Sequence, residues 1–433
     1  MFFEQKRGMA WFLDPGMGKT AMSLELINSL RDFAEAKRVL IVAPLRVTEL
    51  VWPKEVAKWD YDFTVSRLHG DKKGEALRRG DVHLINPEGL TWLVHEAKAA
   101  YDLVIFDEST KFKNWSSQRT KAARKLKTRN TMILTGTPAP NCLSDLYAQI
   151  YLIDRGEALG KNLTQFRSRF MYQGGYENRE WFFRPEMENT LNERIGEMVY
   201  QLKAEDHLDM PEQIINEIDV TLPPSILKAY KQFEKEMYCE IEGKGIIAFQ
   251  PGGKYNLCRQ IASGGFYDEN RVANTLHEVK LDALEDLYDE LHGKPLLVGY
   301  SFLQDWDRIK KRFKHARTIN GSVSSYEAKE TLALWRDGSL TMLACQADSM
   351  GHGIDGIQDV CSDVCWYSVT DKPEIHKQFN TRVYRQGQRD DTVRIHYLLA
   401  QRTVDKTIFK RLQSKDQTQQ EFLRLLKELQ NAE

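Results

Sequence analysis

A glycine-rich loop near the start of the chain constrains the fold more than any other feature. The segment Asp14-Pro15-Gly16-Met17-Gly18-Lys19-Thr20 follows an apolar run, Met9–Leu13, and precedes an amphipathic stretch, Thr20–Leu30. Glycines let backbone N–H groups close around phosphates at the positive end of the following helix. Leu13 stands where the strict G-x-x-x-x-G-K-[ST] pattern has its first glycine. The strand-to-helix setting still predicts a nucleotide-binding α/β domain.

The residues of this loop have distinct expected roles in binding ATP. The backbone of Gly16, Met17 and Gly18 is expected to surround the phosphates, and the Lys19 ammonium is expected to reach the β- and γ-phosphates. The Thr20 hydroxyl is expected to be a ligand of Mg²⁺. The alternative interpretation is a glycine-rich turn that precedes a helix and binds nothing.

Two adjacent carboxylates further along the chain match the chemistry of this loop. Asp107 and Glu108 directly follow an apolar run, Leu103–Phe106. In ATPases one such carboxylate orients the Mg²⁺ shell, and the next polarises the attacking water. We therefore expect Asp107 to hold Mg²⁺ together with Thr20, and Glu108 to be the catalytic base. The alternative is an ordinary solvated strand end.

Alternation of apolar runs with amphipathic stretches predicts an α/β fold with parallel sheets. In residues 1–150, runs such as Val39–Ala43 and Met132–Thr135 alternate with helical patterns, which is typical of βαβ units with a sheet covered on both faces. Residues 151–276 change to a mainly helical, aromatic-rich pattern, and residues 277–433 alternate again before a terminal helix. Further expected strands are Val82–Asn86, Gln213–Leu222, Leu296–Tyr300, Thr341–Cys345, Val364–Tyr367 and Val393–Leu399.

The composition indicates the cellular environment of the protein more clearly than it indicates the binding partner. With a net charge of −1 and a pI of about 6.8, the chain lacks the overall basic surface of a general polyanion binder, although its 61 Lys and Arg residues could form a local basic groove. Six scattered cysteines form no four-ligand zinc pattern. Neither a membrane-spanning run nor a signal-peptide pattern is present. We expect a cytoplasmic protein of a bacterium or an infected host cell, with the nucleus as the alternative compartment.

Two arginines late in the chain complete the predicted catalytic set. Arg382 and Arg385 lie in the segment Gln378–Gln388, and their spacing of three would place both on one face of a helix. Arginines from a second lobe that meet the γ-phosphate would make hydrolysis depend on lobe closure. A solvated basic helix is the alternative interpretation of this segment by itself.

Together these segments resemble helicase superfamily two, and within it the Snf-type translocases, from Met9 to about Asp405. The match follows the family's motif order and consists of the phosphate loop, Val42-Ala43-Pro44-Leu45 (motif Ia), Asp107–Asn114 (motif II), Leu134–Asn141 (motif III), Leu297–Phe302 (motif IV), Ser349–Asp355 (motif V) and Gln378–Gln388 (motif VI). Six ordered motifs are highly specific. Two departures are Ser109, where the family usually has alanine, and Asp371-Lys372-Pro373, where it has Trp-Asn-Pro.

The resemblance implies two RecA-like lobes with a mainly helical insertion between them, which move along nucleic acid as ATP is hydrolysed. It implies a nucleotide contact for Gln378 and a role for Thr135 and Thr137 in coupling the ATP state to lobe movement. The residues implied to contact the nucleic-acid backbone are Pro44, Leu45, Arg46, Lys113, Ser301, Ser349 and Gly351. Snf-type relatives usually track one strand of a duplex without separating it. Double-stranded DNA is therefore the expected partner of a chain that we expect to act as a monomer.

Three other functions remain open from the residues. They are a strand-separating DNA or RNA helicase, a catalytically silent nucleic-acid clamp, and a phosphate-loop enzyme that acts on small molecules. The complete catalytic set disfavours the clamp, and the later motifs disfavour the small-molecule enzyme. Tyr172, Tyr176 and Trp181 of the insertion could stack on bases, although packing in a core is the preferred interpretation.

Overall fold

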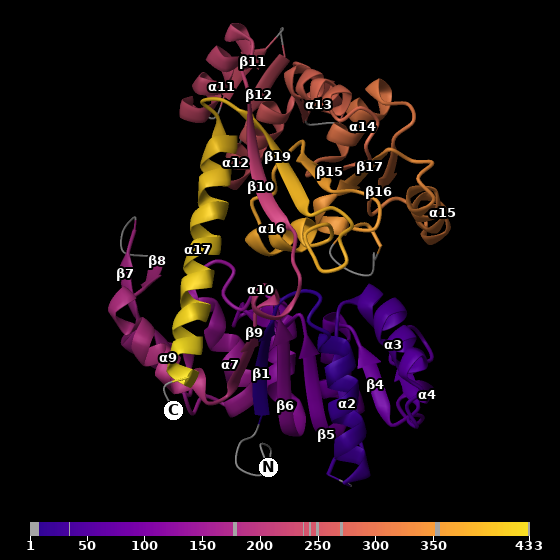
Figure 1. Cartoon of the computed structure of the whole chain (residues 1–433). Helices are drawn as coiled ribbons and strands as arrows, with labels where there is room; N and C mark the ends of the chain where they lie inside the picture. Colours follow the sequence, from indigo (N-terminus) through magenta and orange to yellow (C-terminus); the bar gives the residue numbers. More distant parts are fainter. Residues whose placement is uncertain are drawn as a thin grey trace. The chain divides into compact units, whose positions relative to one another are not determined.

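The structure is a computed structural model of the chain. It describes residues 8–33, 35–175, 180–236, 238–241, 244–247, 251–268, 272–350 and 356–431. The chain forms two compact units (Figure 1). The first contains Met1–His207 and Lys415–Glu433, and the second contains Leu208–Ser414. Among the described residues, no helix is long and apolar enough to cross a membrane.

The first unit is built on a seven-stranded sheet in which every pair of neighbouring strands is parallel. From edge to edge its strands are β3 (Val65–Arg67), β4 (Val82–Ile85), β2 (Val39–Val42), β5 (Ala100–Asp107), β6 (Lys127–Thr135), β1 (Gly8–Leu13) and β9 (Val199–Leu202). Parallel strands end at the same edge of a sheet, so the loops after β1, β2, β5 and β6 gather there.

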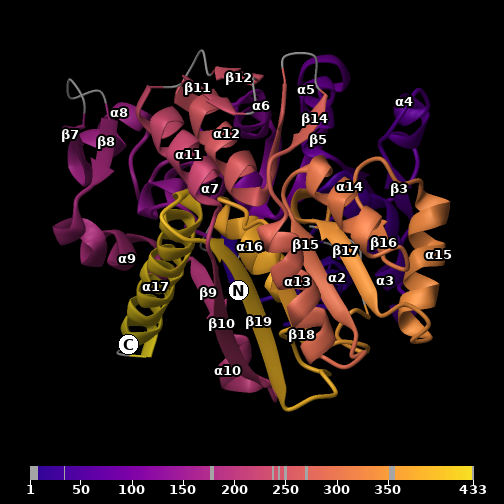
Figure 2. The same ribbon diagram turned by 90° about the horizontal axis from the view of Figure 1, so that it is seen from above.

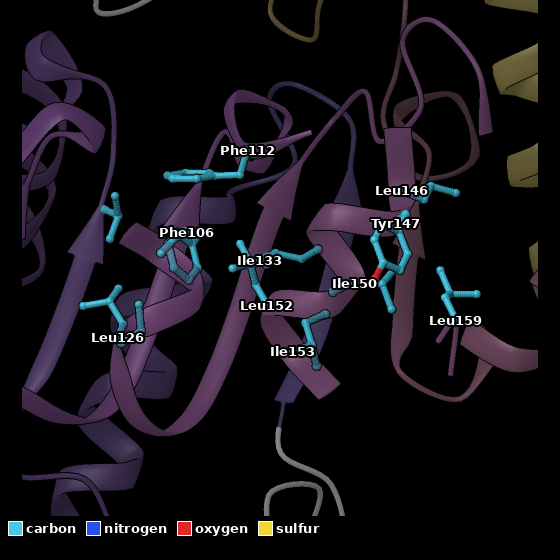
Figure 3. Packing of buried hydrophobic residues seen from close by; sticks show 14 of the residues in the cluster. Phe106, Phe112, Leu126, Ile133, Leu146, Tyr147, Ile150, Leu152, Ile153 and Leu159 are labelled. Atoms are coloured by element: carbon cyan, nitrogen blue, oxygen red, sulfur yellow. The ribbon is translucent and has the colours of Figure 1, made fainter. Parts of the chain in front are cut away.

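Both faces of this sheet are apolar because successive side chains of a strand point to opposite faces. Ala10 and Phe12 of β1 belong to one core cluster, and Trp11 and Leu13 belong to another. The first cluster lies under the helices of one face (Figure 3), which are α6 (Gln118–Lys125), α7 (Leu146–Asp154), α8 (Leu163–Phe170) and α9 (Glu188–Gly196). The second packs against α2 (Lys19–Asp32) and α3 (Trp52–Trp59). Burial on both faces confirms the predicted α/β arrangement.

The second unit is built on a six-stranded parallel sheet (Figure 2). From edge to edge its strands are β10 (Glu212–Val220), β19 (Thr392–Ala400), β18 (Asp363–Trp366), β15 (Leu296–Tyr300), β17 (Met342–Gln346) and β16 (Arg317–Ile319). One face packs against α13 (Val279–Glu290) and α14 (Leu303–Arg312). The other packs against α15 (Ser325–Arg336), α16 (Pro373–Asn380) and the first part of α17 (Val404–Asn431).

The predicted insertion, residues 151–276, is divided between the two units. Its strand β9 completes the first sheet, and β10 forms an edge of the second. Besides helices α10 (Ala204–His207), α11 (Pro224–Glu236) and α12 (Pro251–Ser263), it contains three short antiparallel pairs. These are β7 (Met171–Gly174) with β8 (Glu180–Phe183), β11 (Tyr238–Ile241) with β12 (Lys244–Ile247), and β13 (Gly265–Tyr267) with β14 (Ala273–Thr275). Strands of three or four residues are too short for the alternation of apolar and polar residues to be recognised in the sequence.

Candidate active site

The phosphate loop, Asp14–Gly18, connects β1 to α2 in the first unit, as its residues predict. Gly16 has a φ of 88° and Gly18 a φ of 72°, which are left-handed values that favour glycine. A Cβ atom built on either glycine would meet no heavy atom within 4 Å. The glycines therefore allow the backbone to turn tightly, and they leave the space beside the loop open for phosphate groups.

Lys19 is the first residue of α2, and its side chain folds back over the loop. Its Nζ donates to the carbonyl oxygens of Leu13, at 2.8 Å, and Asp14, at 3.2 Å. The loop is held from the other side, because the backbone N–H of Ala204 donates to Asp14 Oδ2 at 3.2 Å. The Asp14 N–H donates to the Leu202 carbonyl at 3.1 Å. Strand β9 and helix α10 thus support the loop, which the sequence did not indicate.

Asp107 lies at the carboxyl end of β5 and is 9% exposed. Its carboxylate accepts from the indole Nε1 of Trp52, at 3.1 Å, and from the backbone N–H of Glu108, at 3.1 Å. Burial and the charge of Glu108 raise the pKa of Asp107 to about 6, against the lowering effects of the Lys19 ammonium and the Trp52 hydrogen bond. The lysine and the carboxylate are therefore electrostatic neighbours. A divalent cation would relieve the cost of a buried carboxylate at this position.

Glu108 has left-handed backbone angles, with a φ of 53° and a ψ of 56°. Residues other than glycine and asparagine rarely adopt these backbone angles, and those that do are concentrated at functional sites. The chain turns here from β5 into the short 3-10 helix η4 (Ser109–Phe112). The predicted Mg²⁺ ligand and catalytic base are thus separated by a sharp turn of the backbone.

The segment after β6 packs directly against the phosphate loop. A Cβ atom on Gly136 would lie 3.1 Å from the Leu13 carbonyl oxygen and 3.1 Å from Pro15 Cδ, so only glycine fits without displacement. On either side of it, Thr135 and Thr137 are buried, and the Thr137 N–H donates to Thr135 Oγ1 at 3.0 Å. The two threonines expected to couple the ATP state to movement therefore flank a contact with the ATP loop.

Gln149 of α7 links the segments after β5 and β6. Its fully buried amide accepts from the Ser109 hydroxyl at 2.7 Å and donates to the carbonyls of Pro138 and Asp145, each at 2.8 Å. Neither Gln149 nor Trp52 was predicted as part of the site. Trp52 lies 55 positions before Asp107 in the chain, and Gln149 carries no local signal.

The residues expected to bind nucleic acid in the first unit lie at the same edge of the sheet. Pro44 is buried, whereas Leu45 and Arg46 are exposed just after β2. The backbone is fixed there because the Thr48 hydroxyl donates to the Leu45 carbonyl at 2.7 Å. Lys113 is half-buried at the end of η4, close enough to the Asp145 carboxyl to counteract the upward shift that burial gives the pKa of Asp145.

In the second unit, the prediction that Arg382 and Arg385 share a helical face is wrong. Helix α16 contains Gln378 but ends at Asn380, and both arginines lie in the turns that follow. Asn380 is held at this end by Trp366, whose Nε1 donates to Asn380 Oδ1 at 2.9 Å. Among the described residues Gln378 Oε1 is buried and has no hydrogen-bond partner, so it could accept from a ligand.

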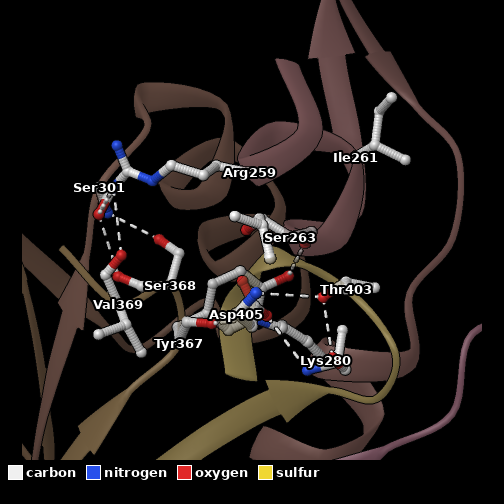
Figure 4. A network of polar contacts seen from close by, with 12 residues as sticks. Arg259, Ile261, Ser263, Lys280, Ser301, Tyr367, Ser368, Val369, Thr403 and Asp405 are labelled. Carbon is white, nitrogen blue, oxygen red and sulfur yellow. Dashed lines mark hydrogen bonds and ion pairs between the residues drawn. The ribbon is translucent and has the colours of Figure 1, made fainter. Parts of the chain in front are cut away.

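The predicted nucleic-acid contacts of the second unit are described only in part. Ser349 ends a short 3-10 helix, and its hydroxyl donates to Gln346 Oε1 at 3.2 Å. Gly351 lies outside the described residues. The Ser301 hydroxyl donates to the Ser368 carbonyl at 3.1 Å and accepts from Arg259 Nη2 at 3.3 Å (Figure 4).

Comparison with known proteins shows what this chain is similar to. The family model of the SNF2-related domain matches residues 4–248. "Putative protein p41" of Acyrthosiphon pisum secondary endosymbiont phage 1 is 30% identical over 98% of this chain and 95% of its own length. "Putative ATP-dependent helicase/translocase YwqA" of Bacillus subtilis (strain 168) is 22% identical over 95% of this chain, which spans only 47% of that protein. The solved "Sulfolobus solfataricus SWI2/SNF2 ATPase core in complex with dsDNA" aligns with 98% of this chain and 91% of its own at 18% identity and a TM-score of 0.45.

The family model covers more than half of the chain, and the phage relative matches almost all of it. The chain therefore belongs to the SNF2-related family of ATP-dependent helicases and translocases.

Proposed function

We propose that the protein is a nucleic-acid-dependent ATPase that moves along double-stranded DNA without separating its strands. The observation that carries the chemistry is the pairing, at one edge of the first sheet, of an open glycine loop with a buried carboxylate that lies within the electrostatic reach of Lys19. This arrangement fits a triphosphate with its divalent cation. Family membership supports the coupling of hydrolysis to movement.

In this proposal the loop residues bind the triphosphate. The N–H groups of Gly16, Met17 and Gly18 hold phosphate oxygens, and Lys19 exchanges its two carbonyl acceptors for the β- and γ-phosphates. Thr20 and Asp107 would hold Mg²⁺, which neutralises the charge that develops on the phosphates. Glu108 orients water toward the γ-phosphate.

The second unit would supply Arg382 and Arg385 to the transition state and Gln378 to the nucleotide. Arginines that act only in the closed state link hydrolysis to the relative movement of the units. Thr135 and Thr137 would transmit the change from the phosphate loop, since Gly136 between them contacts that loop.

DNA would be bound through its phosphates, without base specificity. In the first unit the proposed contacts are Arg46 and Lys113 with the backbone at Pro44 and Leu45. In the second they are Ser349, Gly351 and Ser301. Ser301 already bonds to Ser368 and Arg259, so it would act by releasing those bonds or by holding its loop in place.

The test is ATP turnover without nucleic acid and with single-stranded DNA, duplex DNA or RNA, using Lys19→Ala as the blank. We expect duplex DNA to stimulate strongly and the stimulation to weaken as salt rises, because phosphate contacts release counterions. Turnover that ignores every polymer would overturn the proposal.

Movement without unwinding is tested on two substrates. A translocase displaces the third strand of a DNA triplex but leaves a plain duplex intact. Release of a single strand from the duplex would instead support the strand-separating helicase. Sedimentation during the same experiments would show whether the active species is the proposed monomer.

A further inference from the structure

The β7–β8 hairpin of the first unit presents two aromatic rings to solvent. Tyr172 and Phe182 are opposite each other in the antiparallel register and are 47% and 39% exposed. Their rings stack, with centroids 5.6 Å apart and planes inclined by 29°. Single exposed apolar side chains are common on proteins, but a stacked pair of solvent-facing rings has a large apolar area. We call this pair the aromatic platform.

The opposite face of the hairpin fixes the platform to the core of the first unit. Met171 is buried, and Trp181 and Phe183 pack against the core cluster. Arg184 Nε donates to the Met171 carbonyl at 2.9 Å, which holds the start of the hairpin to its end. The sequence predicted that Tyr172, Tyr176 and Trp181 pack in a core. This prediction is confirmed for Trp181 and wrong for Tyr172, which is exposed. Tyr176 lies outside the described residues.

The backbone at Gly174 helps to fix the ring of Phe182. A Cβ atom at position 174 would lie 3.2 Å from the Phe182 ring, so the ring rests close against this glycine. Because the rings are already ordered, a planar ligand that stacks on them would not have to order them first.

The chain segment that forms the hairpin and the helix before it has a net positive charge, which suits an anionic partner. The described residues of 161–184 include four cations (Lys161, Arg167, Arg169 and Arg184) and one carboxylate (Glu180), a balance of +3 along this stretch, which Glu157 and Glu186 flank. The Arg167 guanidinium lies 5.0 Å from the ring centre of Trp181, which is on the face of the hairpin opposite the platform. Glu180 lies on the same face of the hairpin as the platform, two positions nearer the tip in the register, and it opposes an anion there. Exposed rings on which bases stack, in a segment of net positive charge, are the combination that binds single-stranded nucleic acid.

We infer that the aromatic platform stacks on an unpaired base of DNA, such as a base in a short single-stranded gap. The inference rests on the proposed function, since it takes DNA as the bound polymer, and it adds a site that a fully paired duplex cannot fill. In Figure 1 the hairpin points to the same side of the first unit as the carboxyl ends of its sheet. Those ends carry the proposed phosphate contacts.

The test uses a duplex with a short gap that contains the fluorescent base 2-aminopurine, and an intact duplex of the same sequence. Binding is measured without ATP, in the wild type and in Lys19→Ala. We expect quenching of the probe and tighter binding to the gapped DNA in both proteins. The double variant Tyr172→Ala, Phe182→Ala should lose the quenching and bind gapped DNA about tenfold or more weakly, while its affinity for the intact duplex is unchanged.

Single substitutions separate stacking from other roles. Tyr172→Phe should keep the quenching, and Tyr172→Leu should lose it, because only the first retains a ring. The control is Phe33→Ala, which removes a 77% exposed ring at the end of α2 and should change nothing. Glu180→Gln should tighten binding to gapped DNA slightly.

Several outcomes would overturn the inference. They are equal binding of both DNAs by the wild type, unchanged quenching in the double variant, or a change only in melting temperature, which would indicate that the pair merely stabilises the hairpin. A change in oligomeric state would identify the platform as a protein contact. Strong stimulation of ATP turnover by duplex DNA without quenching would refute the platform alone. Loss of stimulation together with retained quenching would refute only the proposed motor function.

Discussion

The two units bury charge in opposite ways. In the first, the carboxylate of Asp107 lies beside a second carboxylate, and its pKa is raised to about 6. In the second, buried charges are matched. Lys280 Nζ lies 2.5 Å from Asp405 Oδ2, and Arg308 Nη2 lies 2.7 Å from Asp305 Oδ1, with side chains at most 8% exposed. Lys280 also donates to the Tyr367 carbonyl at 3.1 Å (Figure 4).

The difference separates a buried carboxylate with a raised pKa from buried ion pairs whose charges already compensate each other. A buried carboxylate with a raised pKa gains stability when a cation arrives. A matched buried pair gains nothing from a ligand, and removal of one partner leaves an uncompensated charge. Changes near Asp107 should therefore affect ligand binding, whereas changes at the pairs of the second unit should affect folding.

The strongest challenge to this division is Arg385, a proposed catalytic group in the second unit. Arg385→Ala should lower the maximal ATP turnover by about 10³ or more, because it removes an arginine that acts in the transition state. Folding should be unaffected. The control is Arg389→Ala, an exposed arginine of the same segment, which should remain active. Normal turnover in Arg385→Ala would remove Arg385 from the chemistry.

Lys280→Met should destabilise the second unit by about 3–5 kcal/mol, because Asp405 would remain buried without its cation. Hydrogen exchange followed by mass spectrometry, under increasing urea, resolves this loss in peptides from β15 and β18. The double variant Lys280→Met, Asp405→Leu should recover most of the stability. Lys372→Met breaks an exposed pair with Asp348 and should cost less than about 0.5 kcal/mol. Similar losses in the two lysine variants would contradict the proposed role of burial.

Trp52→Phe should weaken Mg²⁺ binding about 10- to 100-fold, because it removes the indole N–H that orients the Asp107 carboxylate. The measurement is Mg²⁺-dependent binding of a fluorescent ATP analogue. Trp59→Phe is the matched control, since its indole donates at 3.0 Å to Glu55, an exposed contact that does not involve Asp107. If both variants weaken Mg²⁺ binding equally, Trp52 does not position the Asp107 carboxylate.

The smallest predicted effect is an opposite response of the two units to mild acid. In the second unit, burial lowers the pKa of His277 and His376 to about 4. The unfolded chain then binds more protons, so stability falls as pH drops below about 6.5, by about 1 kcal/mol per histidine near pH 5.5. In the first unit, burial raises the pKa of three carboxyl groups, Asp107, Asp145 and Asp154, so protonation at lower pH favours the folded state. Burial also lowers the pKa of His83, and this histidine has the opposite effect on stability.

Hydrogen exchange at neutral and mildly acidic pH, corrected for intrinsic rates, measures both responses. Peptides of β15 and β18 should lose protection, and those of β5 and β6 should keep or gain it. His277→Gln should reduce the loss, while His315→Gln, an exposed histidine, should not. A uniform loss in both units would contradict the comparison.

Local sequence predicted the parts of the site in which neighbouring residues carry the signal. The apolar run before Asp107 and the glycines before Lys19 correctly indicated a strand end and a loop before a helix. The roles of these residues in catalysis remain predictions. Edge strands β3 and β16 were not anticipated, because three residues give too little alternation to recognise.

The remaining errors have a tertiary cause. A spacing of three suggested a helix through Arg382 and Arg385, but the packing of Asn380 against Trp366 marks its end. The support that Trp52 gives to Asp107 joins residues 55 positions apart. Such contacts depend on how the strands and helices assemble, which no local pattern records.

The bridge made by Gln149 also constrains how this site could change over evolution. Replacing Ser109 with the alanine common in its family would remove the hydroxyl that donates to a fully buried amide oxygen, at a cost of about 1–3 kcal/mol. The same alanine would be harmless in a relative whose helix carries an apolar residue at the position of Gln149. Positions 109 and 149 should therefore vary as a pair, and alanine at position 109 should be tolerated best together with an apolar residue at position 149.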